Sequence, residues 1–93
     1  MRVGMLIVEF HLPGCHSLKE KRGRLVGLRD RFGKQTNVAV CESDFQNEHQ
    51  RAEWSFVATG AERKVVEQTL RKIENHVETH VDAVVVNIQH DWI

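Results

Sequence analysis

The chain has 93 residues, of which 41% are hydrophobic and 28% are charged. This length and composition predict one globular domain spanning residues 1–93. No apolar run approaches the ~20 residues of a membrane helix, and the N-terminal segment lacks signal-peptide features. We therefore expect a cytoplasmic protein with no membrane role. Cys15 and Cys41 lack a C-x-x-C spacing, which favours free thiols.

The first expected element is a strand at residues 2–12. It is apolar on both sides: Leu6, Val8 and Phe10 share one face, and Val3, Met5 and Ile7 share the other. A strand of this kind is typical of the centre of a sheet that is covered on both faces. Pro13 and Gly14 end it.

A helix is expected next, at residues 17–33. Ser17 and Glu20 form an S-x-x-E capping box, in which each side chain satisfies a free amide of the first turn. Gly33 is expected to end the helix as a C′ glycine. The apolar stripe has helical spacing and consists of Leu18, Leu25, Leu28 and Phe32.

The second half of the chain contains the same kinds of strand and helix pattern. Strands are expected at 36–42, 51–58 and 82–90, and a T-x-x-E box at Thr59 and Glu62 is expected to open a second helix. The stripe of that helix is Val66, Leu70, Ile73 and Val77. The order β-α-β-β-α-β predicts an α+β, ferredoxin-like fold: a four-stranded antiparallel sheet with strands 1 and 3 in the middle and two helices on one face.

The most unusual segment is residues 17–34, which carries seven of the thirteen basic residues. They are Lys19, Lys21, Arg22, Arg24, Arg29, Arg31 and Lys34. With Glu20 and Asp30 as its only acids, the segment has a net charge of +5, and the rest of the neutral chain sums to −5. A basic helix of this kind is the electrostatic footprint of an anion or nucleic-acid contact.

The arginines of this helix form two rows beside its stripe. Arg22 and Arg29 lie on one margin, and Arg24 and Arg31 on the other, with ~10.5 Å of rise between the members of each row. Such rows could straddle RNA phosphates, which arginine binds bidentately. In the alternative, the arginine stems pack on the core, and their heads meet water or acids. Candidate acids are Glu62, Glu67 and Glu74.

Two further features of the helix point to a partner. Lys19 and Lys21 lie in the first turn, where cations oppose the helix dipole, so local stability does not explain them, whereas an anion near the N-terminus does. Gly23 and Gly27 are four residues apart, away from the stripe. They either allow a partner to approach closely or are simply tolerated glycines.

The second face of the sheet suggests self-association. Because two helices cover only one face, the apolar Val3, Met5 and Ile7 favour a homodimer joined through the sheets. The RNA-recognition fold instead stacks bases on strand aromatics. Phe10, Trp54 and Phe56 could be compared with those aromatics, but the segment RAEWSFVA does not match the consensus. We therefore favour core or interface packing for Trp54 and Phe56.

No catalytic or metal constellation emerges from the sequence. His76 and His80 have metal-ligand spacing, but no third ligand is placed beside them, which favours a surface pair. Cys15 and His16 precede a helix, where a thiol can be activated, yet no orienting acid is indicated. We therefore expect a non-catalytic protein without cofactors.

The segment HLPGCHSLKEKRGRL at 11–25 resembles the bacterial YlxP-like family, domain of unknown function 503. The resemblance continues through NVAVCE at 37–42, Asp44, Gln46, Gln50 and the RAE of 51–53, and its most specific element is SLKEKR. It implies a ferredoxin-like fold, a cytoplasmic setting and a gene neighbourhood shared with translation-initiation and ribosome-maturation factors. It carries over no catalytic residues. The chain departs from the family pattern at Cys15-His16 and Trp54.

Three hypotheses follow, of which the third is an enzyme; a structure without a pocket near Cys15 and His16 would count against that one. The leading one is a small RNA- or ribosome-associated binding protein that uses the helix at 17–34. The alternative is a structural or regulatory homodimer, joined through its sheet faces, without a nucleic-acid role.

Overall fold

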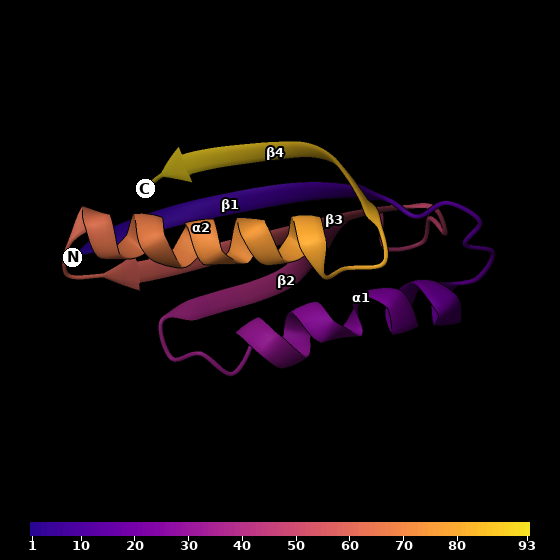
Figure 1. Ribbon diagram of the computed structural model, residues 1–93, viewed down its shortest axis with the longest axis horizontal. Helices are drawn as coiled ribbons and strands as arrows, with labels where there is room; N and C mark the ends of the chain where they lie inside the picture. The colour runs from indigo at the N-terminus through magenta and orange to yellow at the C-terminus, as the bar shows by residue number, and fades with distance from the viewer.

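The computed structural model describes residues 1–93 and contains the expected β-α-β-β-α-β order (Figure 1). The elements are β1 (Arg2–His11), α1 (Leu18–Phe32), β2 (Val38–Asp44), β3 (Arg51–Gly60), α2 (Arg63–Thr79) and β4 (Val84–Trp92). The strands form one antiparallel sheet in the order β2-β3-β1-β4. The predicted ferredoxin-like fold, with the first and third strands in the centre, is therefore confirmed.

The core lies between one face of the sheet and the two helices. The core residues of the two central strands, β1 and β3, are each at most 4% exposed, and they are Leu6, Val8, Phe10, Ala52, Trp54, Phe56 and Ala58. The three aromatic residues are thus buried beneath the helices and cannot stack against bases from solvent. The packing role favoured from the sequence for Trp54 and Phe56 follows from the alternation of side chains across the sheet.

The two helices cover different parts of the sheet. In Figure 1, α2 lies over the central strands and α1 lies beside β2 at the edge of the sheet. Gly4 of β1 allows α2 to come close, because a Cβ atom there would lie 2.9 Å from Leu70 and 3.0 Å from Val66. All four predicted stripe residues of α2 are buried.

One predicted helix start is wrong, and one predicted helix end has the right position but a different cap. Thr59 does not cap α2: it continues β3, pairs with Val3 of β1 and donates its amide hydrogen to Asn37 O at 3.1 Å. The helix begins four residues later, after Glu62, whose side chain makes no capping hydrogen bond. Gly33 ends α1, but in the right-handed conformation (φ −68°), so the expected left-handed cap is absent.

Candidate nucleic-acid interface

The start of α1 is fixed by the predicted N-cap. Ser17 Oγ accepts a hydrogen bond from the amide of Glu20 at 3.0 Å. The Glu20 carboxylate reaches back one residue further than expected and accepts from the amide of His16 at 3.1 Å. Satisfying these amides sets where the helix begins, and that in turn sets which basic side chains point outward.

Lys21 corrects the predicted site. Its side chain is buried, at 2% exposure. Its Nζ donates to the carbonyl oxygens of Phe45 at 2.7 Å and Glu48 at 2.9 Å, and it forms an ion pair with Glu42 at 3.1 Å. The assignment of Lys21 to an anion-binding surface is therefore wrong, because all of its partners lie within the chain. This lysine fastens α1 to β2 and to the connection between β2 and β3.

Arg24 is also occupied within the fold. Its Nη1 donates to Pro13 O at 3.0 Å, and its guanidinium lies 3.6 Å from carboxylate oxygens of both Glu20 and Asp82. Because its side chain is 19% exposed, Arg24 presents little free charge. The prediction of a binding role is replaced here by a role in holding the loop before α1.

The acids proposed as partners for the arginines of α1 are engaged elsewhere. Glu67 pairs with Arg63 on its own helix at 3.1 Å, and Glu74 contacts His90 of β4 at 2.6 Å. Glu62 forms no ion pair with α1. That expectation is therefore wrong, since α2 turns these acids toward its own surface and toward β4.

Five basic side chains of the segment are exposed and form no ion pair with any acid of the chain. We call them the α1 ridge: Lys19, Arg22, Arg29, Arg31 and Lys34. The guanidinium of Arg29 lies 5.8 Å from the centre of the Trp54 ring, and that of Arg31 lies 5.8 Å from the centre of the Phe32 ring. These stems rest on aromatic surface while the charges remain accessible.

On the β2 side of the ridge, a pocket of about 140 Å³ opens between α1 and the sheet. Its lining includes Arg22 and Arg29 from α1, Glu42 from β2 and Trp54 from β3. The indole Nε1 of Trp54 is buried and has no hydrogen-bond partner. Sequence reasoning missed this pocket because it joins residues from three elements.

On the α2 side, Arg31 faces a shallow groove lined by polar residues of α2. They are Lys72, Asn75, His76 and Thr79, together with the C-cap residue His80. The His76 and His80 rings stack in parallel, 5.1 Å apart and 2° between planes, so their in-plane nitrogen lone pairs do not converge on a single ion. Burial, Arg31 and His80 lower the pKa of His76. No group of three histidine, cysteine or carboxylate side chains is arranged to hold a metal.

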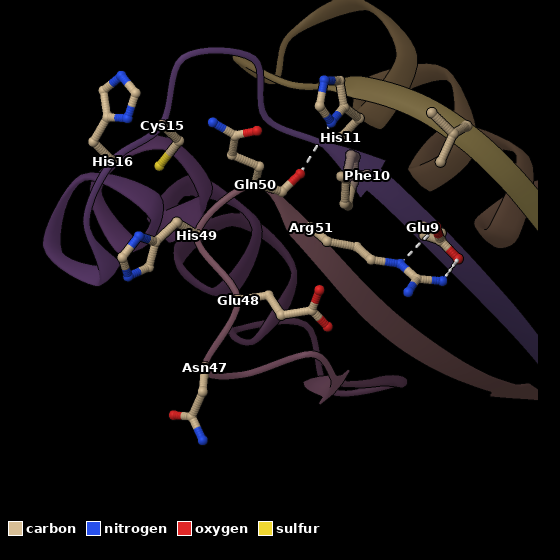
Figure 2. A pocket seen from close by; sticks show the side chains of 11 residues that line it. Glu9, Phe10, His11, Cys15, His16, Asn47, Glu48, His49, Gln50 and Arg51 are labelled. Atoms are coloured by element: carbon tan, nitrogen blue, oxygen red, sulfur yellow. Dashed lines mark hydrogen bonds and ion pairs between the residues drawn. The ribbon is translucent and has the colours of Figure 1, made fainter.

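Cys15 and His16 lie at the largest depression, an open hollow of about 690 Å³ at one end of the sheet (Figure 2). Cys15 is buried and its Sγ donates to Ser17 O at 3.5 Å. Burial, together with the nearby Glu20 carboxylate, raises the pKa of the thiol. In Figure 2 the ring of His16 points away from the sulfur. This environment favours the neutral thiol, the opposite of an activated nucleophile.

The face of the sheet away from the helices is bare. Val3, Met5 and Ile7 alternate with the core residues of β1 and are partly exposed. In β3, Val57 pairs with Met5 and shares this face. On α1, a Cβ atom added at either predicted contact residue, Gly23 or Gly27, would meet no atom within 4 Å. Both surfaces are open, and their use as interfaces stays a prediction.

The fold and these surfaces define an α+β, ferredoxin-like protein with a basic helix. A family model described as "Protein of unknown function (DUF503)" matches residues 3–90. The chain therefore belongs to this family, which confirms the resemblance to domain of unknown function 503. No curated protein matches the sequence. No helix is long and apolar enough to cross a membrane.

Solved structures resemble the chain in fold. A dimeric ferredoxin-like protein from an uncultured marine organism is 8% identical with a TM-score of 0.59, and the match covers 100% of this chain and 96% of that one. A putative PII-like signaling protein from Thermus thermophilus is 16% identical with a TM-score of 0.43, covering 100% and 89%. At such identities the first match shows the fold alone, and the second is too distant to support an argument.

Proposed function

We propose that this protein is a small non-catalytic binding protein that contacts RNA, in the setting of the ribosome, through the α1 ridge. One observation carries the proposal: five exposed cations lie along one helix and its end without an acid partner. One acid of the same segment, Asp30, is also exposed and forms no ion pair. Unpaired cations at this density repel one another, and a polyanion removes that repulsion.

The proposal predicts a strong dependence on salt. Each neutralised phosphate releases a condensed counterion, so about five contacts imply a loss of about 10²- to 10³-fold in affinity between 50 mM and 200 mM salt. Contacts to the phosphate backbone also predict weak sequence preference. The RNA is therefore expected to be recognised by its charge and shape.

The test measures binding of a fluorescently labelled structured RNA by anisotropy across a salt series. The variant Arg29→Glu with Arg31→Glu is expected to weaken binding at least about tenfold. Neither side chain forms an ion pair, so the variant should fold. Arg24 is avoided because it holds the loop before α1.

The matched control reverses two exposed cations on the other helix, as Lys64→Glu with Arg71→Glu. This control changes the net charge of the protein by the same amount as the α1 variant. If the α1 ridge is the contact, the control should reduce the affinity for RNA much less than the α1 variant does. Binding that is indifferent to salt, or that falls equally in both double variants, would contradict the proposal.

A second candidate function is homodimerisation through the bare sheet face. It is supported by the row of partly exposed apolar side chains, Val3, Met5 and Ile7 with Val57. A partner sheet would remove this surface from water, at about 25 cal/mol per Å² of apolar area. The similar fold from the marine organism is described as dimeric.

Sedimentation from micromolar to millimolar concentration tests this candidate. The wild type is expected to dimerise, and Ile7→Glu is expected to shift it to monomer by placing a charge in the apolar row. Gln68→Glu, on the exposed side of α2, introduces the same charge and should leave the dimer intact. A wild type that stays monomeric throughout rules out this interface.

A further inference from the structure

The groove on the α2 side of the α1 ridge is lined only by polar side chains. It has a volume of about 260 Å³ and lies where the end of α1 meets the end of α2. Arg31 lines its α1 side, and the α2 side consists of Lys72, Asn75, His76, Thr79 and the C-cap residue His80. No carboxylate is among them, so every formal charge in the groove is positive. A ligand that fits must bring acceptor atoms and negative charge.

The ring of His76 is fixed in the groove without using its own nitrogens. It lies edge-on to Phe32, with ring centres 5.2 Å apart, and it stacks on His80. The Nδ1 atom of His80 is itself held by the hydroxyl of Thr79 at 2.6 Å. A side chain that is already ordered loses little conformational entropy when it binds a ligand.

The ring nitrogens of His76 are open to a ligand. The side chain is half-buried and lines the groove, and its ring forms no hydrogen bond within the chain. Trp54 Nε1 is the one side-chain polar atom of the chain that is both buried and unpaired. The unpaired nitrogens of His76 are therefore not closed off from the groove. A protonated imidazole donates from both of its nitrogens.

The positive charges around His76 favour its neutral form in the free protein. Burial, together with Arg31 and His80, lowers its pKa, and Lys72 adds a further cation to the same groove. An anion placed among these groups has the opposite effect, because a negative charge nearby favours the protonated ring. Binding of an anion and protonation of His76 are therefore coupled.

No acid of the surrounding elements takes the place of this anion. Beneath α2, the side chains of β1 and β3 that face it are apolar. Glu74 is held by a histidine of β4, and Asp82, which follows α2, is held by an arginine of α1. Asp30 and Glu78 are exposed and do not line the groove. The positive charge of the groove is left for a ligand to match.

We propose that this groove binds a phosphate group and that His76 gains a proton from solvent as the phosphate binds. Arg31 and Lys72 supply the fixed positive charges. The carbonyl ends of the two helices offset about one of these charges, and the remainder matches a phosphodiester. Protonated His76 then donates a charge-assisted hydrogen bond to a phosphate oxygen.

The phosphate is that of an RNA backbone or of a free phosphorylated metabolite. The RNA source rests on the proposed function, because Arg31 belongs both to the groove and to the α1 ridge. The small-molecule source does not depend on it.

Proton uptake makes phosphate binding depend on pH. A proton on His76 and a phosphate in the groove strengthen each other's binding by the same factor. The pKa of His76 lies below its ordinary value of 6.5 in the free protein and rises when phosphate binds. Affinity therefore increases as the pH falls through this window, by about tenfold between about pH 7.5 and about pH 5.5.

The direct test follows the ring Cε1–H signal of His76 in a ¹H–¹³C spectrum as the pH is varied. His76→Asn assigns this signal among those of the six histidines. Trimetaphosphate, whose charge is constant over this pH range, is expected to raise the pKa of His76. Chloride at equal ionic strength should not. Arg31→Gln with Lys72→Gln should abolish the rise. A pKa that trimetaphosphate leaves in place, or raises equally in that double variant, overturns the inference.

The RNA arm measures anisotropy of the labelled RNA at both ends of the pH window. Wild type is expected to bind about tenfold more tightly at the lower pH, and His76→Asn to gain much less. His49→Asn is the matched control, because it also removes an exposed or half-buried histidine but one that lines the hollow at the end of the sheet. It should keep the pH dependence of the wild type. Equal pH dependence in His76→Asn and His49→Asn overturns the RNA source.

The outcomes distinguish this inference from the proposed function. If RNA binds with salt dependence but trimetaphosphate leaves the pKa of His76 in place, the groove inference fails and the proposed function stands. If trimetaphosphate raises this pKa but RNA binds at neither pH, the groove takes a small anion and the RNA proposal fails.

Discussion

The helices α1 and α2 cover the same face of one sheet, yet they differ in what they bury. The buried residues of α2 are all aliphatic: Val66, Leu70, Ile73 and Val77. The buried face of α1 includes Lys21 among its apolar residues. Outside the core each helix has one i,i+4 ion pair, Glu20 with Arg24 on α1 and Arg63 with Glu67 on α2. The α1 helix additionally carries the α1 ridge, whose cations have no acid partner.

The requirements of the fold explain the sequence of α2 but not the outward side of α1. A buried apolar stripe opposite a polar face is what a stable surface helix requires, and α2 meets that requirement. In α1, two interior glycines and unpaired cations lower stability. Departures from local consistency of this kind tend to occur at functional sites. The outward side of α1 is therefore where we place binding.

The largest expected effect on stability comes from replacing Lys21, the buried lysine of α1. Lys21→Met leaves the Glu42 carboxylate and the carbonyl oxygens of Phe45 and Glu48 without their donor. We expect a loss of about 3 kcal/mol in the free energy of unfolding, as when one partner of a buried ion pair is removed. Urea unfolding measures it. The exposed Lys19→Met should change stability by less than about 0.5 kcal/mol, and equal effects would contradict the structural role of Lys21.

The glycines of α1 test whether its outer face is free in the folded chain. Beyond the backbone of α1 itself, no atom lies within 4 Å of a Cβ atom added at Gly23 or Gly27. Gly23→Ala and Gly27→Ala should therefore each raise the free energy of unfolding by about 1 kcal/mol through helix propensity. Thermal unfolding measures the change. Destabilisation by either substitution would mean that the face is already packed against something.

The S-x-x-E and T-x-x-E boxes look alike in the sequence, but only the first caps a helix. Ser17 caps α1, so Ser17→Ala should cost about 1 kcal/mol. Thr59 is an exposed strand residue that caps nothing, so Thr59→Ala should cost less than about 0.5 kcal/mol. Chemical unfolding of both variants measures the difference. Similar losses would show that the T-x-x-E box does act on α2.

The smallest expected effect concerns pH and α2. The pKa of His76 lies below its ordinary value of 6.5, so the unfolded chain binds more protons than the folded one just below pH 6.5. The stability that neutral His76 contributes is complete above pH 6.5 and is lost as the pH falls through the folded-state pKa. Unfolding measured on both sides of pH 6.5 should show a smaller acid loss in His76→Asn. An unchanged loss would contradict the assignment.

The sequence by itself determined the elements and their order. Alternating apolar residues predict β1 and β3, and helical spacing predicts α2, because each pattern reports which side chains face the core. The family resemblance rested on local segments such as SLKEKR and was confirmed. The prediction for Lys21 was wrong, although its spacing of three and four residues from Leu18 and Leu25 is that of the buried stripe.

Only the tertiary structure decided what the polar residues do. The acceptors of Lys21 lie 24 and 27 residues away, and the pocket beside Trp54 joins α1, β2 and β3. Thr59 and Ser17 begin similar motifs, yet Thr59 is part of β3, where it pairs with Val3 of β1. The physical reason is that the spacing of apolar residues along the sequence shows which side chains are buried. A hydrogen bond or ion pair depends on a partner that only the folded chain brings within reach.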